Sequence, residues 1–262
     1  MPELPEVSYS KKYVDATVLH KKISELKFSD DLILEASKKE LKSALVNHEF
    51  TGTVRHGKYL FLEITSGKSL VLHFGMTGHL EYAHHGEAPD YAYFTITFTD
   101  ASKLFFICPR KLARVYLTES VDQFKKDHDL GPDALDLSQE DFQQLTKGKR
   151  GSIKGLLMNQ KAIAGLGNLY ADEVLFQSKV HPKSKVSALS EKEVKTIHKQ
   201  IGKVLERVTK SKIQDTALPS NYLTRHRKAG TDCPKCGGKV KMEKVSGRSS
   251  YFCPACQKEK SS

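Results

Sequence analysis

The sequence has no long apolar run. Hydrophobic residues make up 39% of the chain, but no stretch approaches the roughly 18 apolar residues of a membrane-spanning helix. The first residues include the acids Glu3 and Glu6 rather than the basic and then apolar pattern of a secretion signal. Basic amphipathic helices with an aromatic face are also missing, which disfavours a membrane surface as partner. We expect a soluble, unsecreted protein of the cytoplasm, associated with the nucleoid, or of the nucleus.

The first part of the chain has no excess of positive charge, and the whole excess lies in the second part. Residues 1–146 contain 17 Lys and Arg against 22 Asp and Glu, a net of −5. Residues 147–262 contain 25 against 9, a net of +16, and the two parts together give the formal charge of +11. Such asymmetry is typical of a nucleic-acid-binding region attached to another domain.

The first part of the chain is predicted to be rich in strands. A helical pattern runs from about Glu6 to His20, and short apolar or alternating segments follow at 50–57, 58–65, 69–75, 91–98 and 103–109. No helix long enough for a parallel crossover lies between these segments. The pattern therefore predicts an antiparallel sandwich or barrel-like sheet.

The hydrophobic period becomes helical from Ser138 onward. Ser138 and Ser190 each precede a helical segment and have an acid three residues later, as in helix N-caps. We expect a cluster of helices followed by a tail rich in Gly, Pro and Lys. The chain shows no internal repeat and no low-complexity tract.

Four of the five cysteines form the most specific local pattern. Cys233, Cys236, Cys253 and Cys256 are arranged as C-x2-C, sixteen residues, C-x2-C, a spacing that closes a tetrahedral thiolate shell around one zinc ion. Disulfides are the alternative, but they are rare in a chain without a secretion signal. The pattern predicts one structural Zn2+ without an open position for catalysis. Cys108, in an apolar strand, is interpreted as a buried small hydrophobe.

A glycine-containing turn at 163–168 precedes another predicted helix. Gly165 and Gly167 before Asn168 would let a phosphate approach the helix N-terminus, although such a turn between helices is also common without a ligand. Arg150 and Lys154 lie just upstream in the basic part. This setting favours a phosphate of DNA or RNA.

The opening PELPEV, the segment AGLGNLYADEVLF and the four-cysteine tail, in this order, resemble the formamidopyrimidine-DNA glycosylase/endonuclease VIII family. The resemblance covers nearly the whole chain and implies an α+β multidomain fold. Its parts would be an N-terminal antiparallel β-sandwich (1–130), a helix-two-turn-helix domain (131–220) and a zinc finger (221–262). It implies a monomeric repair enzyme that excises oxidised bases from damaged double-stranded DNA and nicks the strand by β,δ-elimination.

Helix geometry explains Pro5 and Glu6 of the opening segment, but it does not explain Pro2 and Glu3. If Met1 is removed, Pro2 becomes a secondary amine; a terminal amine has a pKa near 8, against about 10.4 for lysine. By resemblance, Pro2 is the Schiff-base nucleophile and Glu3 the proton donor or acceptor. Glu6 is the family's second acid, with a plain helix acid as the alternative.

The resemblance assigns two further cations to the lesion nucleotide. Lys58, in RHGKYLFL, matches the family's sandwich lysine, which would approach the lesion and its phosphate. Arg248, in GRSSYFC, matches the zinc-finger arginine that clamps the lesion phosphate, for which the planar guanidinium is suited.

An enzyme that acts on a base within a duplex extrudes that base and fills the gap. Met76 matches the family's void-filling methionine and Arg110 the arginine that faces the orphaned base; a core methionine and a surface charge are the alternatives. The family's wedge phenylalanine falls on Leu112, and a family histidine falls on Tyr91. In the helical region, Arg150, Lys154 and Asn168 match backbone-phosphate contacts.

The segment between Lys210 and Cys233 is too short for the long loop that caps 8-oxoguanine in many family members. Formamidopyrimidines, hydantoins, oxidised pyrimidines and abasic sites are therefore equally plausible substrates. Two other function classes stay open. One is a catalytically weak or silent relative that binds damaged or abasic DNA, which would need neither Pro2 nor Glu3. The other is an RNA-binding zinc-ribbon protein, which would be expected to carry aromatic signatures that this chain lacks.

Overall fold

The computed structural model describes residues 2–261. The contacts divide the chain into two compact units, Met1–Asp129 and Leu130–Ser262. The boundary predicted at 130/131 lies one residue from this division, and the boundary predicted at 220/221 falls inside the second unit. Each unit is described by itself.

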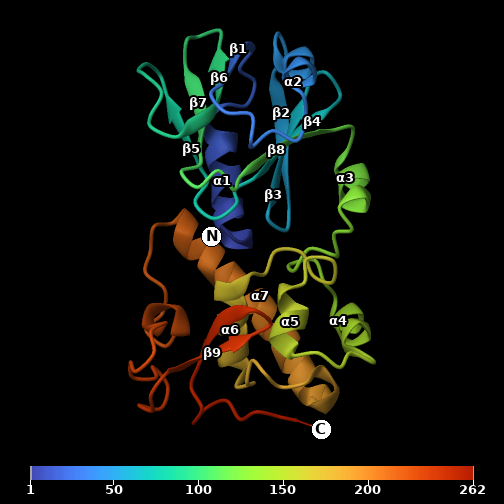
Figure 1. The fold of residues 1–262 in the computed structure, drawn as a ribbon, viewed down its shortest axis with the longest axis vertical. Helices are drawn as coiled ribbons and strands as arrows, with labels where there is room; N and C mark the ends of the chain where they lie inside the picture. Colours follow the sequence, from blue (N-terminus) through green and yellow to red (C-terminus); the bar gives the residue numbers. More distant parts are fainter. Residues whose placement is uncertain (1, 262) are drawn as a thin grey trace. The chain divides into compact units, whose positions relative to one another are not determined.

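Two four-stranded antiparallel sheets form the first unit (Figure 1). One has the strand order β1-β6-β7-β5, from Ile23–Phe28, Ala92–Phe98, Lys103–Ile107 and His79–Ala83. The other has the order β2-β3-β4-β8, from Phe50–His56, Tyr59–Ile64, Ser69–His73 and Arg114–Thr118. The helices of this unit are α1 (Leu4–Thr17), α2 (Lys38–Leu45) and α3 (Val121–Asp127).

One large apolar cluster joins both sheets and α1. Leu60 and Leu72 from one sheet, Phe94 and Phe106 from the other, and Val14 of α1 all belong to the same buried cluster. Burying these side chains is the main favourable term for the unit, worth roughly 1.5–3 kcal/mol for each large apolar group. The predicted antiparallel sandwich is therefore confirmed.

The sequence prediction missed several elements of this unit. Strands β1, β5 and β8 and helices α2 and α3 were not predicted. The three strands pair with β6, β7 and β4, which lie far from them in the sequence, so no local pattern reveals these strands. The first helix begins at Leu4 and ends at Thr17, rather than running from Glu6 to His20. The reason for the early start is that Glu3 serves as the N-cap residue and Pro5 lies in the first turn, where its missing N–H costs nothing.

The second unit is helical, with a small hairpin near its end. It contains α4 (Gln139–Thr146), α5 (Ile153–Met158), α6 (Asn168–Ser178), η1 (Val186–Ala188), α7 (Glu191–Ile213), η2 (Leu223–His226), β9 (Lys241–Val245) and β10 (Arg248–Phe252). Both predicted N-caps are confirmed: the hydroxyl of Ser138 accepts a bond from the N–H of Asp141, and that of Ser190 from the N–H of Glu193.

The four-cysteine region packs on α6. Phe176 of α6 and Leu223 of η2 share a buried cluster with Cys233, Val240 and Cys253. Among residues 2–261, no helix combines the length and apolar character needed to cross a membrane.

Candidate functional site

The N-terminal segment holds a buried acid beside Pro2. Glu3 is only 1% exposed, whereas Pro2 is partly exposed. The backbone N–H of Glu3 donates to Oε2 of Glu6 at 2.9 Å, in a capping-box arrangement that fixes the start of α1. The expectation that Glu3 stands outside the helix geometry was wrong, because Glu3 is the cap itself. Met1, whose removal would free the Pro2 amine, lies outside the described residues.

Lys58 lies in the tight turn between β2 and β3. The turn depends on Gly57, whose φ of +55° is readily adopted by glycine. The ammonium of Lys58 is one of the charges near His73 of β4. Burial, followed by the positive charges of Lys58 and Arg114, lowers the pKa of His73 to about 4.

Three exposed side chains assigned to base extrusion lie on two adjoining loops. Met76 follows β4 and is 38% exposed; Arg110 and Leu112 lie between β7 and β8, and Leu112 is 44% exposed. Gly75 brings these loops together, since a Cβ on it would lie 2.3 Å from the Leu112 carbonyl oxygen.

Tyr91 belongs to a neighbouring loop. Its side chain is 53% exposed, and its carbonyl accepts the N–H of Cys108 at 3.1 Å, at the start of the loop that bears Arg110. The structure thus gathers Met76, Tyr91, Arg110 and Leu112 at one end of the sandwich. Cys108 is 1% exposed and belongs to the core cluster, as predicted.

Arg248 lies at the beginning of β10, immediately after the hairpin turn. Its side chain is exposed, and its backbone pairs with Val245 of β9. Gly247 in the turn has a φ of +74°. Arg150 is also exposed and lies two residues before Ser152, the N-cap residue of α5.

Lys154 does not have the position expected of a phosphate-binding lysine. Its side chain is completely buried, and its Nζ lies 2.6 Å from Oδ1 of Asp172 and 2.6 Å from the hydroxyl of Ser250. A buried ammonium requires a paired anion, and this one has its anion within the protein. The prediction of a direct DNA contact by Lys154 is therefore corrected to a structural role.

Asp172 is the centre of this buried cluster and was not identified from the sequence. Its Oδ2 accepts bonds from Nη2 of Arg227 at 2.8 Å and from the backbone N–H of Tyr251 at 3.0 Å. The guanidinium of Arg227 also lies over the Tyr251 ring, 4.4 Å from its centre. Burial raises the pKa of Asp172, while the charge of Lys154 opposes that shift. The sequence signal that could have identified Asp172 is its position as an acid within the otherwise largely apolar helix segment LYADEVLF.

Asn168, at the first position of α6, points to the same hairpin. Its side-chain amide donates to the Ser249 carbonyl at 3.1 Å, and its Oδ1 is buried with no hydrogen-bond partner in the described structure. The amide nitrogen carries two protons, so this bond leaves a second donor for a phosphate. Because phosphate oxygens only accept hydrogen bonds, the phosphate contact predicted for Asn168 would have to use this amide nitrogen.

Glu173 is a second buried acid of α6 that sequence reasoning missed. Its carboxylate accepts the backbone N–H of Thr224 at 2.7 Å and the side-chain amide of Gln177 at 2.7 Å. Burial raises the pKa of Glu173, and these bonds counteract the shift. Glu173 thereby fastens η2, which leads into the cysteine region.

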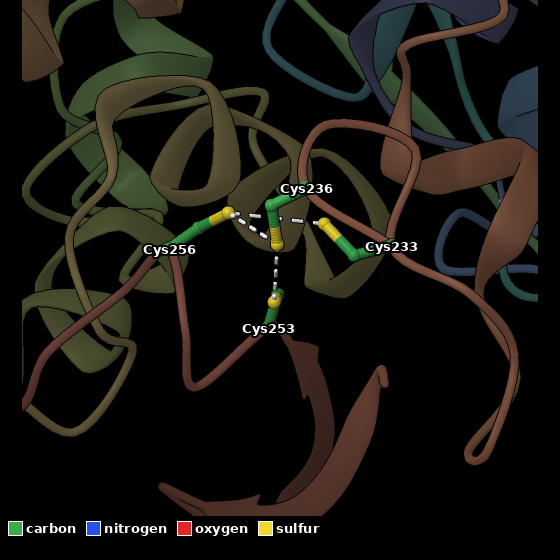
Figure 2. Close-up of side chains that lie close together, drawn as sticks. All are labelled: Cys233, Cys236, Cys253 and Cys256. Atoms are coloured by element: carbon green, nitrogen blue, oxygen red, sulfur yellow. Dashed lines mark hydrogen bonds between the residues drawn. The ribbon is translucent and has the colours of Figure 1, made fainter. Parts of the chain in front are cut away.

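The four cysteine side chains point toward one another, as Figure 2 shows. Sulfur–sulfur distances are 3.8 Å for Cys233 and Cys256, 3.6 Å for Cys236 and Cys253, and 3.3 Å for Cys236 and Cys256. A tetrahedron with Zn–S bonds of about 2.3 Å has edges of about 3.8 Å, whereas a disulfide has S–S of about 2.05 Å. The residues present therefore fit one zinc ion held by four thiolates. This is the predicted structural Zn2+ site.

Three family models match consecutive parts of the chain. They describe the formamidopyrimidine-DNA glycosylase N-terminal domain (1–115), the formamidopyrimidine-DNA glycosylase H2TH domain (130–217) and a zinc finger found in FPG and IleRS (232–258). The formamidopyrimidine-DNA glycosylase of Mycoplasma mobile is 34% identical over 98% of this chain and 99% of its own length. The chain belongs to the formamidopyrimidine-DNA glycosylase family.

Solved structures of this family have the same fold. Lactococcus lactis formamidopyrimidine-DNA glycosylase, bound non-covalently to DNA containing an AP site, matches with a TM-score of 0.88 at 27% identity, over 98% of this chain and 100% of that chain. A MutM structure in complex with DNA containing carbocyclic 8-oxo-G matches with a TM-score of 0.89, with the same identity and coverage. The predicted helix-two-turn-helix and zinc-finger parts are confirmed together with the sandwich.

Proposed function

We propose that this chain is a DNA glycosylase with AP lyase activity. It excises oxidised bases from damaged double-stranded DNA and then cuts the strand at the abasic site. The observation that supports this function best is that Pro2 directly precedes the buried acid Glu3 at the start of α1. Glu3 is a carboxyl group held 1% exposed, directly beside the residue that becomes the terminal amine when Met1 is removed.

Base excision begins with the amine of Pro2. Its neutral form attacks C1′ of the lesion nucleotide, and the C1′–N bond to the damaged base breaks as the N–C1′ bond forms. The leaving base takes up one proton. The Pro2 nitrogen then loses its own proton, and the C1′–O4′ bond breaks as O4′ takes up a proton, with Glu3 as the proton donor. The product is an iminium ion between Pro2 and C1′.

Strand cleavage follows from the iminium, which withdraws electrons and acidifies the C2′ proton. Loss of that proton to a base breaks the C3′–O bond and expels the 3′ phosphate. A second deprotonation and elimination expels the 5′ phosphate, and hydrolysis of the iminium restores the Pro2 amine. Glu6 holds the backbone of Glu3 during these steps, through the 2.9 Å bond.

Cations stabilise the phosphates of the lesion strand. Arg248 binds the lesion phosphate with its guanidinium, and Lys58 approaches the lesion nucleotide. Arg150 and Asn168 bind backbone phosphates elsewhere. The net charge of +16 in residues 147–262 supplies the long-range attraction to DNA. Binding is therefore expected to weaken steeply as salt increases.

The loops at one end of the sandwich fill the gap left by the extruded base. Met76 enters the vacated space, Arg110 faces the orphaned base, and Leu112 inserts as an apolar wedge. Tyr91 adds an exposed aromatic ring beside them. The close approach of Gly75 to Leu112 supports joint action of the two loops.

We further propose that 8-oxoguanine is not the preferred lesion. Between the end of α7 at Ile213 and the start of η2 at Leu223, the chain has room only for a short loop. Excision rates on duplexes with formamidopyrimidine, hydantoin, oxidised pyrimidine or 8-oxoguanine would test this. A clear preference for 8-oxoguanine would contradict it.

Borohydride trapping tests the proposed chemistry. The purified protein is incubated with lesion-containing and abasic duplexes, reduced, digested and analysed by mass spectrometry. We expect a covalent adduct on Pro2, and intact mass should show that Met1 is absent. Replacing Pro5 by Ala provides a control, because its nitrogen lies within the helix and this variant should still be trapped. Failure to trap on every lesion and abasic duplex would refute the proposal.

A further inference from the structure

The loop between β7 and β8, which bears Arg110 and Leu112, is connected to the sandwich by an ion pair. Nζ of Lys111, between Arg110 and Leu112, lies 2.5 Å from Oδ2 of Asp30. The same ammonium lies 5.0 Å from the centre of the Tyr93 ring. Lys111 thus points back onto the sandwich, while Leu112 next to it is exposed.

Asp30 stands on a segment that is itself fastened to the sheets. Its Oδ1 accepts the N–H of Leu32 at 2.9 Å. The N–H of Ser29 donates to the carbonyl of Tyr93 in β6 at 3.0 Å, and the N–H of Val115 in β8 donates to the carbonyl of Ile33 at 2.8 Å. A carboxylate on such a segment can position a loop.

A second connection runs from the same segment to the same loop. Oε1 of Glu35 pairs with Nε of Arg114 at 2.8 Å, and Nη1 of Arg114 donates to the Lys111 carbonyl at 3.2 Å. Lys111 is therefore held through both its ammonium and its carbonyl. This matters because its φ is +52°, a left-handed conformation that a non-glycine residue adopts only at a cost.

We propose that Asp30 and Lys111 are positioning residues for base extrusion. Their ion pair holds the loop so that Arg110 and Leu112 project toward the duplex. Leu112 lacks the rigid ring of an aromatic wedge, so the orientation of its backbone has to come from such contacts. The inference rests on the proposed function.

The test uses Asp30→Asn, with Asp31→Asn as the matched control. Asp31 is the next residue of the same segment and pairs with Lys38 of α2 at 2.6 Å, away from the loop. Both substitutions remove one negative charge, so any general gain in attraction to DNA is the same. Only Asp30→Asn releases Lys111.

Base extrusion is followed by stopped-flow fluorescence of 2-aminopurine placed opposite or beside the lesion. We expect Asp30→Asn to slow extrusion by about 3- to 10-fold, and kcat on the lesion duplex to fall equally, with DNA affinity unchanged or higher. Asp31→Asn should match the wild type. Exchanging the two charges, with Asp30→Lys and Lys111→Glu together, should restore at least part of the extrusion rate.

A single-stranded abasic oligonucleotide separates this inference from the proposed function. It has no base to extrude, so trapping on it should be the same for the wild type and Asp30→Asn. If the wild type traps on neither substrate, the proposed function fails. If the wild type is active and Asp30→Asn either equals Asp31→Asn or loses activity equally on both substrates, the positioning role is overturned.

Discussion

Replacing Lys154 by Met tests the energetic importance of the buried cluster in the second unit. Lys154 and Asp172 are both fully buried, with Nζ and Oδ1 2.6 Å apart. Methionine has a similar volume but carries no charge and donates no hydrogen bond, so the variant removes the ammonium without leaving a large cavity. The substitution therefore isolates the polar contribution.

Removing one partner of a buried ion pair costs about 3–5 kcal/mol, because the other charge stays in the low-dielectric interior. In this variant Asp172 keeps Arg227 at 2.8 Å and the N–H of Tyr251 at 3.0 Å. We therefore expect the lower end of the range, about 3 kcal/mol. Asp172→Asn should lower the free energy of unfolding further, since it removes the shared anion of both Lys154 and Arg227.

The control is Lys239→Met in the same unit. Lys239 pairs with Asp232 at the same distance of 2.6 Å, but the two side chains are 64% and 73% exposed. An exposed pair contributes about 0–1 kcal/mol, so this variant should be nearly as stable as the wild type. The two variants share the substitution and the ion-pair distance and differ in burial.

Urea unfolding of the zinc-loaded protein, followed by far-UV circular dichroism, measures the difference. Tryptophan fluorescence is not an option because the chain has no Trp. If Lys154→Met loses no more free energy of unfolding than Lys239→Met, burial does not control the strength of this pair and the reasoning is wrong.

Three further outcomes follow from the structure. In the folded protein burial lowers the pKa of His73 to about 4, whereas in the unfolded chain His73 binds a proton at the ordinary pKa of 6.5. The neutral His73 therefore contributes fully to the free energy of unfolding above pH 6.5, and this contribution is lost as the pH falls toward 4. Wild-type stability in urea titrations should thus decline over this window by up to about 3 kcal/mol more than that of His73→Gln, with the exposed His20→Gln resembling the wild type. Gly75→Ala should lower the free energy of unfolding by about 1–3 kcal/mol more than Gly67→Ala does. Both glycines have a positive φ, but only a Cβ at position 75 would lie 2.3 Å from the Leu112 carbonyl oxygen. Equal thermal midpoints of the two variants would contradict this. Chelation should release one zinc per chain in a colorimetric assay and abolish DNA cleavage, with Zn2+ restoring it, whereas full cleavage by the metal-free protein would argue against a structural metal.

The fold could be predicted where the sequence pattern is local. The five predicted strand segments and the caps at Ser138 and Ser190 follow from alternation and from side-chain capping, which act over a few residues. Strand β1, with the burial pattern of two core residues among polar ones, was missed because its pairing with β6 is a long-range contact. The cysteine spacing predicted the metal site because four ligands of one type leave few other arrangements.

The candidate site could be predicted less completely, because residue type does not determine burial. Lys154 and Arg150 lie four residues apart in the same basic part of the chain, yet Arg150 is exposed and Lys154 is fully buried. The difference is the position of Asp172, eighteen residues later on α6, which no local pattern around Lys154 reveals.

The buried cluster also explains how an exposed arginine can have a defined position. Ser249, next to Arg248, has a carbonyl that accepts bonds from Asn168 at 3.1 Å and from Arg227 at 3.3 Å. Both donors belong to segments that Asp172 or α6 holds in place. The side chain of Arg248 is exposed, but the backbone that follows it is held at two points. These are the Ser249 carbonyl, which accepts from Asn168 and Arg227, and the Tyr251 N–H, which donates to Asp172. If Arg248 binds the lesion phosphate as proposed, a guanidinium on such a support loses less conformational entropy on binding than one on a free hairpin. The buried pair of Lys154 and Asp172 would then favour phosphate binding by holding this hairpin.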